Sequence, residues 1–427
     1  MSGMLSIYAF DELWNLANTV RYGLMALQHR GLQSYVVCST GVDVECVEGS
    51  DIDVAKSASG HVAIASIHNY ENEKTFTIQR SNEYSVAIVA ERPWRRIDDF
   101  ALDLVNVLKT SRNRVEAFTN ALSNLQRDSE DVVPSLMVLT KDKEVFVWRS
   151  HNGFSPIALG SYGFDMAIAA SESVAIDILG GDLKKFLRPG EGIYISRHML
   201  KTFLVNQADA YNGLCLFEFL YLSRHDAIIN NVSVYEFRKA LGYDLGKYLD
   251  KEVDVVVGVP ETALPYAIGF SSRVGKPFEV AFVATGGRRR SMLASNPFEK
   301  IVAIHLKMNP IRSSLEGKKV AIVDDSMVTG STIKTVSQIL RFRVGVREIH
   351  LFIASPPLIR SCPYNVMKLD MQNLLAANLS KELAKSYLEV DSLHWLSIED
   401  VDRVARMFGL RFCGRCLGVN VIGGEEK

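Results

Sequence analysis

The chain has 427 residues, of which 48% are hydrophobic and 23% are charged, and this composition is typical of a globular protein with two or more domains. The formal net charge of -1 argues against a dedicated nucleic-acid-binding protein. No apolar run reaches the roughly 18 residues of a membrane-spanning helix, and the first residues carry acids in place of a basic signal segment. We therefore expect a cytoplasmic protein that binds neither nucleic acid nor membrane. Its cysteines should then be metal ligands or buried thiols rather than disulfides.

The first half of the chain mixes short apolar runs of strand character with helical patterns. This mixture predicts an α+β layered domain. A Pro-Gly turn closes that domain ahead of its last strand. The predicted strands lie at 84–90, 136–139, 144–148 and 193–195, and the predicted helices lie near 12–30 and 98–125.

The second half alternates apolar strands with helical segments, which is typical of a parallel sheet with crossover helices. The change in character places a domain boundary between about 197 and 215. We therefore predict domains at 1–200 and 201–390 and a carboxyl-terminal tail at 391–427. The predicted strands of the second half lie at 254–260, 278–283, 320–323 and 349–353.

The stretch from 319 to 332 is the most informative about function. Val320 to Val323 form an apolar run of the kind found in the middle of a parallel sheet, and apolar residues at helical spacing begin at Ile333. The turn between them opens a helix, where backbone N–H groups and the helix dipole favour an anion such as phosphate. The candidate anion-binding residues of this turn are Ser326, Thr329, Gly330, Ser331 and Thr332.

Two acids, Asp324 and Asp325, precede this turn. Carboxylates beside a phosphate site repel a bare phosphate, so we expect them to bind another part of the same ligand, either a sugar diol or a magnesium ion. One ligand that combines these groups is phosphoribosyl pyrophosphate (PRPP), which carries a phosphate, a vicinal diol and a metal-bound pyrophosphate. PRPP is therefore the candidate ligand of this stretch. The alternative interpretation is an ordinary turn between a strand and a helix with Asp and Ser caps.

The same stretch resembles the PRPP motif of type I phosphoribosyltransferases, and further segments resemble the amidophosphoribosyltransferase family, the glutamine phosphoribosylpyrophosphate amidotransferases. The match is weak in the first half of the chain and close in the second. It implies an N-terminal nucleophile (Ntn) hydrolase-like αββα domain with a glutaminase ancestry, followed by a type I phosphoribosyltransferase domain with a parallel sheet. The matching segments are 22–31, 60–62, 157–160, 170–173, 188–191, 215–226 and 232–238.

The glutaminase residues of that family are replaced in this chain. Ser2 stands where the family has its N-terminal cysteine nucleophile, and a hydroxyl ionises less readily than a thiol. Ala63 stands at the position of the arginine that grips glutamine, and Glu91 lies where the family has an asparagine-glycine oxyanion hole. The resemblance therefore implies a retained scaffold without glutamine hydrolysis. Structural roles are expected for His29, Arg30 and His61.

Two loops of the second half also depart from the family pattern. Glu261 and Thr262 lie in the first turn of the sheet, where the family binds pyrophosphate through a Ser-Gly pair. The segment 285–293 falls at the family's catalytic loop, and its three arginines either neutralise a departing pyrophosphate or form a solvated basic loop. Lys307 and Arg312 match the family as candidate anion ligands, with ordinary surface charge as the alternative.

A lone CxxC pair at 413–416 fits zinc, a redox site or neither. Two further cysteines lie in segments that match the family, and the family members with a cluster hold a [4Fe–4S] centre at four such positions. Four thiolates suit iron–sulfur or zinc, and the resemblance favours iron. Buried thiols are expected at Cys38 and Cys46. The implied cluster ligands are Cys215, Cys362, Cys413 and Cys416.

The resemblance implies an enzyme of de novo purine biosynthesis that forms 5-phosphoribosylamine and pyrophosphate from PRPP and ammonia. Asp324 and Asp325 would act as its catalytic carboxylates and would also bind Mg²⁺. The ammonia would come from solution or from another subunit. One alternative is a non-catalytic PRPP-binding regulatory subunit of an active paralogue, and another is a phosphoribosyltransferase that uses a base as nucleophile. The family suggests tetramers or dimers, so we expect a homo-oligomer or, under the first alternative, a hetero-oligomer with the active paralogue.

Overall fold

The structure is a computed structural model that describes residues 2–70, 72–81, 84–127, 132–205, 213–283, 308–367 and 369–424. The chain divides into two compact units. Unit 1 comprises residues 1–218, 222–232 and 364–367, and unit 2 comprises residues 219–221, 233–363 and 368–427. The expected division at 200 and 390 stays a prediction.

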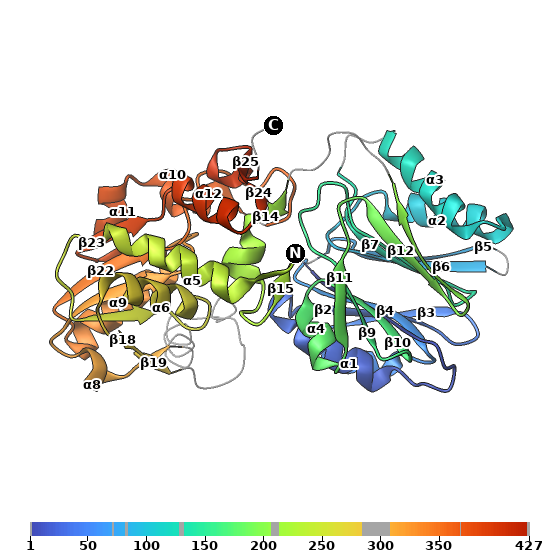
Figure 1. The fold of residues 1–427 in the computed structure, drawn as a ribbon, viewed down its shortest axis with the longest axis horizontal. Helices are drawn as coiled ribbons and strands as arrows, with labels where there is room; N and C mark the ends of the chain where they lie inside the picture. Colours follow the sequence, from blue (N-terminus) through green and yellow to red (C-terminus); the bar gives the residue numbers. More distant parts are fainter. Residues whose placement is uncertain are drawn as a thin grey trace. The chain divides into compact units, whose positions relative to one another are not determined.

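Unit 1 consists of two antiparallel sheets that pack face to face, with helices on both outer faces (Figure 1). One sheet has the strand order β11-β9-β10-β1-β4-β2-β3 and the other has the order β13-β12-β8-β7-β6-β5. The strands are β1 Gly3–Ala9, β2 Ser34–Thr40, β3 Val44–Gly49, β4 Val62–His68, β5 Phe76–Ser81, β6 Tyr84–Ala90, β7 Leu136–Thr140, β8 Val145–Trp148, β9 Ala158–Tyr162, β10 Met166–Ala170, β11 Asp182–Phe186, β12 Glu191–Ser196 and β13 Met199–Leu204.

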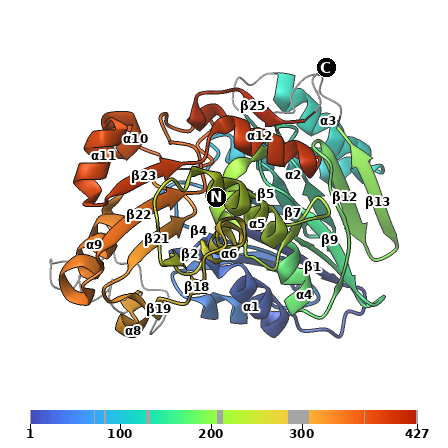
Figure 2. The same cartoon turned by 60° about the vertical axis from the view of Figure 1, so that its left-hand side comes forward.

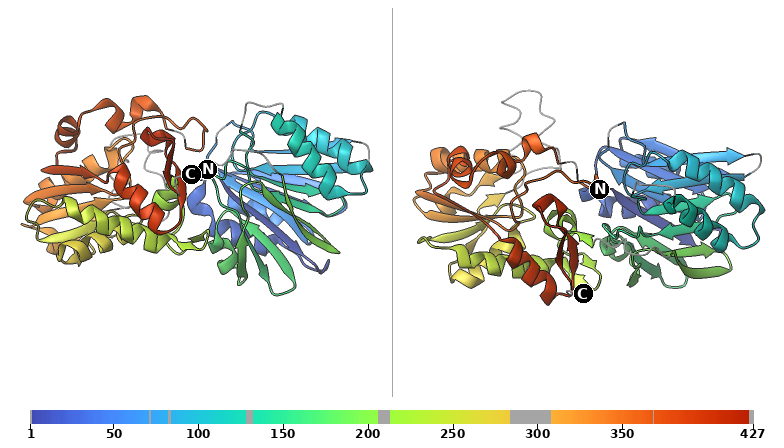
Figure 3. Two further views of the ribbon diagram at one scale, coloured as in Figure 1. Left: turned by 45° about the horizontal axis from the view of Figure 1, so that its top comes forward. Right: turned by 90° about the horizontal axis from the view of Figure 1, so that it is seen from above.

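Alternation of side chains along these strands produces three apolar layers in unit 1. Met4, Val62 and Val89 belong to the cluster between the two sheets. The outer face of the seven-stranded sheet packs against α1 (Ala17–Ala26) and α4 (Ser173–Ile178), and the six-stranded sheet packs against α2 (Ile97–Thr110) and α3 (Arg114–Arg127). Figure 3 shows α2 and α3, in cyan, outside the six-stranded sheet. The predicted αββα architecture is confirmed.

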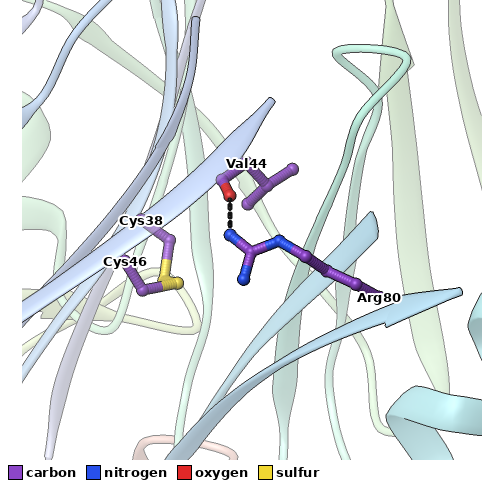
Figure 4. Close-up of a disulfide and its surroundings, with 4 residues drawn as sticks. All are labelled: Cys38, Val44, Cys46 and Arg80. Atoms are coloured by element: carbon purple, nitrogen blue, oxygen red, sulfur yellow. Dashed lines mark hydrogen bonds between the residues drawn. A yellow bond between two sulfur atoms is a disulfide. The ribbon is translucent and has the colours of Figure 1, made fainter. Parts of the chain in front are cut away.

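The hairpin of β2 and β3 corrects the expectation of free thiols at Cys38 and Cys46. Their sulfur atoms form a disulfide (Figure 4). The antiparallel register places the two residues directly opposite each other, with 4.0 Å between their Cα atoms. Sequence spacing alone does not give this pairing, because it depends on where the hairpin turns.

Unit 2 is built on a five-stranded sheet with the order β18-β17-β21-β22-β23 (Figure 2). All four strand pairs are parallel, which confirms the predicted α/β class of this half. The helices α9 and α11 contribute to the apolar cluster on one face of the sheet, while α5 packs on α6, which covers β17 and β21. These elements are β17 Val255–Gly258, β18 Phe278–Glu279, β21 Lys319–Asp324, β22 Glu348–Ile353, β23 Ser392–Trp395, α5 Val234–Leu245, α6 Leu264–Val274, α9 Ser331–Ile339 and α11 Lys381–Leu388.

Local sequence accounts for the helix starts in unit 2. The Ser233 side chain accepts a hydrogen bond from the Glu236 N–H at the start of α5, as in a capping box. Pro265 lies in the first turn of α6, where its missing N–H costs nothing.

The remaining elements are β14 Leu214–Cys215, β15 Ile228–Ile229, β16 Val232–Ser233, β19 Phe282–Val283, β20 Asn309–Pro310, α8 Arg312–Leu315, α10 Leu375–Asn378, α12 Ile398–Met407, β24 Arg411–Cys413 and β25 Val421–Gly423.

Several boundaries differ from the predicted ones. The helical pattern near 98–125 consists of two helices, because Ser111 is extended and the Asn113 side chain accepts a hydrogen bond from the Glu116 N–H in the first turn of the second helix. The single strand predicted at 278–283 is two short strands. A further strand, β13, follows the one predicted to be last in the first half. Within the described residues, no helix is long and apolar enough to cross a membrane.

Candidate functional site

The carboxyl ends of β17 and β21 meet where the strand order of the sheet changes direction. In open α/β sheets, ligands bind outside the strand ends at such a switch point. Gly258 lies opposite Val323 in the register, and the Val259 N–H donates to the Val323 carbonyl at 3.0 Å. The turn after β17 and the loop after β21 therefore lie side by side at this edge.

The acidic pair lies at the end of β21. Asp324 is the last residue of the strand, and Asp324 and Asp325 are only 8% and 3% exposed. The Asp325 N–H donates to Asp324 Oδ1 at 3.0 Å, and Ser326 Oγ donates to Asp325 Oδ1 at 3.0 Å. Among the described side chains, none forms a well-aligned hydrogen bond with Asp325 Oδ2. A buried acceptor is thus available to a ligand or a cation.

Burial and mutual repulsion govern the charge of this pair. Burial raises the pKa of Asp324 well above its usual range, and the charge of Asp325 raises it further. Burial also raises the pKa of Asp325, although Thr262, Arg238 and Ser326 act in the opposite direction. Two adjacent buried carboxylates resist carrying two negative charges at once. A cation or a pair of hydroxyl donors would relieve that repulsion.

The loop after the acidic pair leads directly into α9. Gly330 is the residue before the helix and has a φ of 71°, a left-handed conformation that glycine adopts without strain. A Cβ on Gly330 would also come within 2.9 Å of the Leu388 side chain. Thr329 Oγ1 and Ser331 Oγ lie 2.9 Å apart, and the Leu375 N–H donates to the Val328 carbonyl at 2.8 Å. The loop thus presents two hydroxyls at a helix start, the position that favours an anion.

The structure brings most of the predicted PRPP-binding residues to this edge of the sheet. Lys307 and the arginine-rich segment 285–293 lie outside the described residues. Arg312 begins α8, and its guanidinium group donates to the Arg343 carbonyl. The residues at the edge are Asp324, Asp325, Ser326, Thr329, Gly330, Ser331 and Thr332 on the loop and α9, with Glu261 and Thr262 on the turn after β17.

Unit 1 contains a second group of predicted residues at the start of β1. Ser2 is 1% exposed, and its hydroxyl donates to the Glu91 carbonyl. The Glu91 carboxylate is also buried and accepts hydrogen bonds from Ser155 Oγ at 2.7 Å and from the Ser135 N–H at 3.2 Å. Burial alone would raise the pKa of Glu91, but the Arg92 charge and these hydrogen bonds outweigh it and lower the pKa. Ser2 therefore contacts the carbonyl of a residue whose side chain is a stable carboxylate.

Arg30 joins three parts of unit 1 around that strand start. Its Nε donates to the Ser2 carbonyl at 3.2 Å. Its Nη atoms contact both Glu218 oxygens, at 2.9 and 2.6 Å, and one Glu172 oxygen, at 2.6 Å. His29 Nε2 lies 2.6 Å from the same Glu172 oxygen. This network agrees with the structural role that was expected for His29 and Arg30.

The predicted cluster cysteines fall in both units. Burial, together with the charges of Cys362 and Cys413, raises the pKa of Cys416 to about 12. The Ile359 and Arg360 N–H groups both donate to the Cys416 carbonyl at 3.2 Å. No three His, Cys, Asp or Glu side chains in the described ranges form a ready-made metal site. Cys215 is a buried thiol of unit 1.

Sequence reasoning missed Arg238 on α5, whose charge acts on Asp325, and Tyr266 on α6, on which the charges of both carboxylates act. Both are fully buried. Arg238 lies at the end of a segment that matches the family, but an arginine on a helix does not reveal which strand end it faces. Two features of the sequence could have pointed to Arg238. One is its place as a charged residue on the apolar side of α5, and the other is the pair of glycines on the neighbouring helices α5 and α6.

Comparison with known proteins gives concordant matches. The model of the phosphoribosyl transferase domain matches residues 238–355. An amidophosphoribosyltransferase of Methanothermobacter thermautotrophicus is 29% identical and covers 93% of this chain and 90% of its own length. That of Bacillus subtilis is 28% identical and covers 97% and 92%. A solved glutamine PRPP amidotransferase from B. subtilis, complexed with ADP and GMP, superposes with a TM-score of 0.80 at 25% identity and covers 98% of this chain and 96% of that chain.

Proposed function

Because this chain is a homologue of the amidophosphoribosyltransferases, we propose that it forms 5-phosphoribosylamine and pyrophosphate from PRPP and ammonia in purine biosynthesis. In this reaction the bond between C1 of the ribose and the pyrophosphate breaks, a bond from C1 to the ammonia nitrogen forms, and the nitrogen loses a proton to water. The observation that carries the proposal is the buried pair Asp324 and Asp325, with an oxygen available, next to the start of α9.

Each group of residues at the site binds a different part of PRPP. The Thr329 to Thr332 turn binds the 5′-phosphate through its hydroxyls and the helix start. Asp324 and Asp325 accept hydrogen bonds from the ribose hydroxyls and thereby orient C1 toward the nucleophile. Glu261 and Thr262 face the pyrophosphate side of the site.

Magnesium fits this arrangement without a dedicated protein cage. The described residues hold no group of three candidate ligands, and Mg²⁺ commonly takes only one or two carboxylates and fills its coordination shell with water and substrate phosphates. Asp324 and Asp325 would hold it. When bound, the ion supplies positive charge to the departing pyrophosphate.

We also propose that unit 1 does not hydrolyse glutamine. The Ser2 hydroxyl is buried and bonded to the Glu91 carbonyl. The Glu91 carboxylate, which lies where the family resemblance places an oxyanion hole, would repel the negative charge of a tetrahedral intermediate. The ammonia would then come from solution or from another subunit. The cytoplasmic location and the oligomeric state stay predictions.

A pyrophosphate-release assay tests the reaction. Purified protein with PRPP and Mg²⁺ should release pyrophosphate when ammonium is added. Glutamine as the only nitrogen source should support neither pyrophosphate release nor glutamate formation. Asp325→Asn should abolish the ammonium-dependent rate. Glutamine-dependent turnover that is lost in Ser2→Ala would overturn the second proposal.

The second candidate function is a non-catalytic PRPP-binding subunit that pairs with an active paralogue. The observation that favours it is the turn after β17, which has Glu261 and Thr262 in place of the family's Ser-Gly pair. PRPP binding with no ammonium-dependent turnover, alone or with magnesium in excess, would leave only this function.

For the cysteines we propose a [4Fe–4S] cluster held by Cys215, Cys362, Cys413 and Cys416. The charges of Cys362 and Cys413 act on the Cys416 thiol, and four thiolates are the usual ligands of such a cluster. Its role would be structural. Anaerobically purified protein should be brown and contain about four irons per chain, and Cys413→Ser should lose the colour. Colourless protein with stoichiometric zinc would contradict this assignment.

A further inference from the structure

Ser355 carries a buried hydroxyl that the fold itself does not use. The residue is 1% exposed, and its Oγ has no hydrogen-bond partner among the residues that the structure describes. A buried hydroxyl without a partner costs free energy, because it has given up its hydrogen bonds with water. A ligand that supplies the missing partner would account for its presence.

The backbone places Ser355 at the same edge of the sheet as the acidic pair. β22 ends at Ile353, which lies opposite Asp324 of β21. The N–H of the next residue, Ala354, donates to the Asp324 carbonyl at 2.8 Å and so extends the pairing of the two strands by one step. Ser355 follows directly. It is therefore the first residue beyond this pairing, at the carboxyl edge of the sheet.

This edge has a second buried polar atom in the same condition. Asp325 Oδ2, just beyond the end of β21, also lacks a well-aligned partner among the described side chains. A hydroxyl can donate or accept a hydrogen bond, and a carboxylate oxygen accepts one. Two such groups beyond adjacent strands suit one ligand that lies across the strand ends and carries both hydroxyls and phosphate oxygens.

The residues after Ser355 hold it in a defined conformation. Pro356 and Pro357 follow it, and a proline restricts the residue before it to an extended backbone. This backbone has little freedom left to lose when a ligand binds. Rotation about the Cα–Cβ bond of Ser355 still moves the hydroxyl among its staggered positions. The hydroxyl can therefore turn toward a ligand without a change in the backbone.

We propose that Ser355 is a further ligand-binding residue of this site, whose hydroxyl forms a hydrogen bond with the phosphorylated sugar. β17 and β22 flank β21 on opposite sides, so Ser355 binds from the side away from Glu261 and Thr262. The site then draws on three strand ends instead of two. The inference rests on the proposed function, because it takes PRPP as the ligand.

Calorimetric titration with PRPP and Mg²⁺ tests the contact. Ser355→Ala should weaken binding by about threefold to tenfold, the loss expected for one hydrogen bond. Ser355→Cys, which refills the space but offers only a weak donor, should also weaken it. Equal affinity in the wild type and Ser355→Ala would overturn the proposal. Full recovery in Ser355→Cys would overturn it too, because volume alone would then explain the loss.

Ser337→Ala is the matched control. Ser337 lies on α9 of the same unit, is 0% exposed, and has an Oγ that likewise lacks a partner within the described part of the chain. Because it lies within a helix and not at a strand end, its substitution should leave PRPP affinity unchanged. A loss as large as that of Ser355→Ala would mean that any buried hydroxyl of unit 2 affects binding, and would overturn the specific role of Ser355.

Urea unfolding without ligand separates the ligand contact from a structural role. Since the hydroxyl has no partner in the free protein, Ser355→Ala should leave the equilibrium constant of unfolding unchanged or lower it. A rise of about tenfold would mean that the hydroxyl stabilises the fold, and would overturn the proposal. A wild type that binds no PRPP would refute the proposed function and the inference together, whereas a wild type that binds PRPP no more tightly than Ser355→Ala would refute the inference alone.

Discussion

Arg30 is the residue on which the start of β1 depends, because its guanidinium group bonds the Ser2 carbonyl, Glu172 and Glu218. All three charged side chains are fully buried. Burial would raise the pKa of Glu172, but His29 and Arg30 outweigh it and lower the pKa to about 2. The sign follows from the unfolded value of about 4.3. The interaction stabilises the folded state fully above that pH and is lost as the pH falls toward 2.

We predict that Arg30→Met lowers the free energy of unfolding by about 3 to 5 kcal/mol at pH 7, because it leaves two buried carboxylates without their cation. The difference from the wild type should shrink as the pH falls below about 4, where the carboxylates become protonated in both states. Urea unfolding at several pH values measures this. A pH-independent difference would contradict the charge argument.

Arg21→Met provides the control for that series. The Arg21 side chain is 34% exposed and lies 3.6 Å from Asp53. An exposed pair of this kind contributes less than about 1 kcal/mol. A loss as large as that of Arg30→Met would show that removal of any arginine, buried or not, destabilises unit 1.

Residues that act through local chemistry could be predicted from the sequence, and residues that act through packing could not. The two acids and the small polar turn follow an apolar run directly, so chain order alone places them at a strand end. The packing of α5 against α6, in contrast, depends on Gly242 and Gly269, which let the two helices touch. That contact joins two separate helices, and a single sequence read by itself does not reveal it.

At the scale of elements, the β2–β3 hairpin shows how register decides chemistry. A one-residue change in register would pair Cys38 with a residue other than Cys46, and the disulfide could not form. The hairpin is also held from the other sheet, because Arg80 Nη2 donates to the Val44 carbonyl at 2.9 Å (Figure 4). The sequence between the cysteines contains Gly41 and Asp43, residues common in turns, and this was the available signal for a hairpin.

We predict that reduction of the Cys38–Cys46 disulfide lowers the free energy of unfolding by about 2 to 3 kcal/mol, the loop-closure contribution for a bridge of this short span. Urea unfolding with and without dithiothreitol measures the difference. Cys38→Ser/Cys46→Ser is the control, and its stability should not respond to the reductant. Two free thiols at these positions in the untreated protein, found by mass spectrometry, would contradict the disulfide.

The strands of the parallel sheet were predicted where apolar runs are continuous, as in β17, β21 and β22. Prediction failed where an element is short or interrupted. The run at 278–283 looks uniform in sequence, yet Phe278 pairs with β17 while Phe282 pairs with Pro310 of β20. The choice of partner strand is a property of the fold and not of the run itself.

At the scale of the whole molecule, the two units match the expected features of the amidophosphoribosyltransferases to different degrees. Unit 2 has the acidic pair, the turn that we propose to bind phosphate, and the strand order that brings them to one edge. Unit 1 has the αββα layers, but Ser2 is buried with its hydroxyl on the Glu91 carbonyl, and the lowered pKa of Glu91 favours its charged form. We therefore expect one chain to combine a working phosphoribosyl site with a scaffold that no longer hydrolyses an amide.

Titration calorimetry of PRPP with Mg²⁺ tests the central claim most directly. We predict saturable binding to the wild-type protein at neutral pH, and at least about tenfold weaker binding to Asp325→Asn, which corresponds to about 1.4 kcal/mol. Ser337→Ala should bind as the wild type does. No saturable heat with the wild type, or equal affinity in Asp325→Asn, would contradict a PRPP site at the carboxyl ends of β17 and β21.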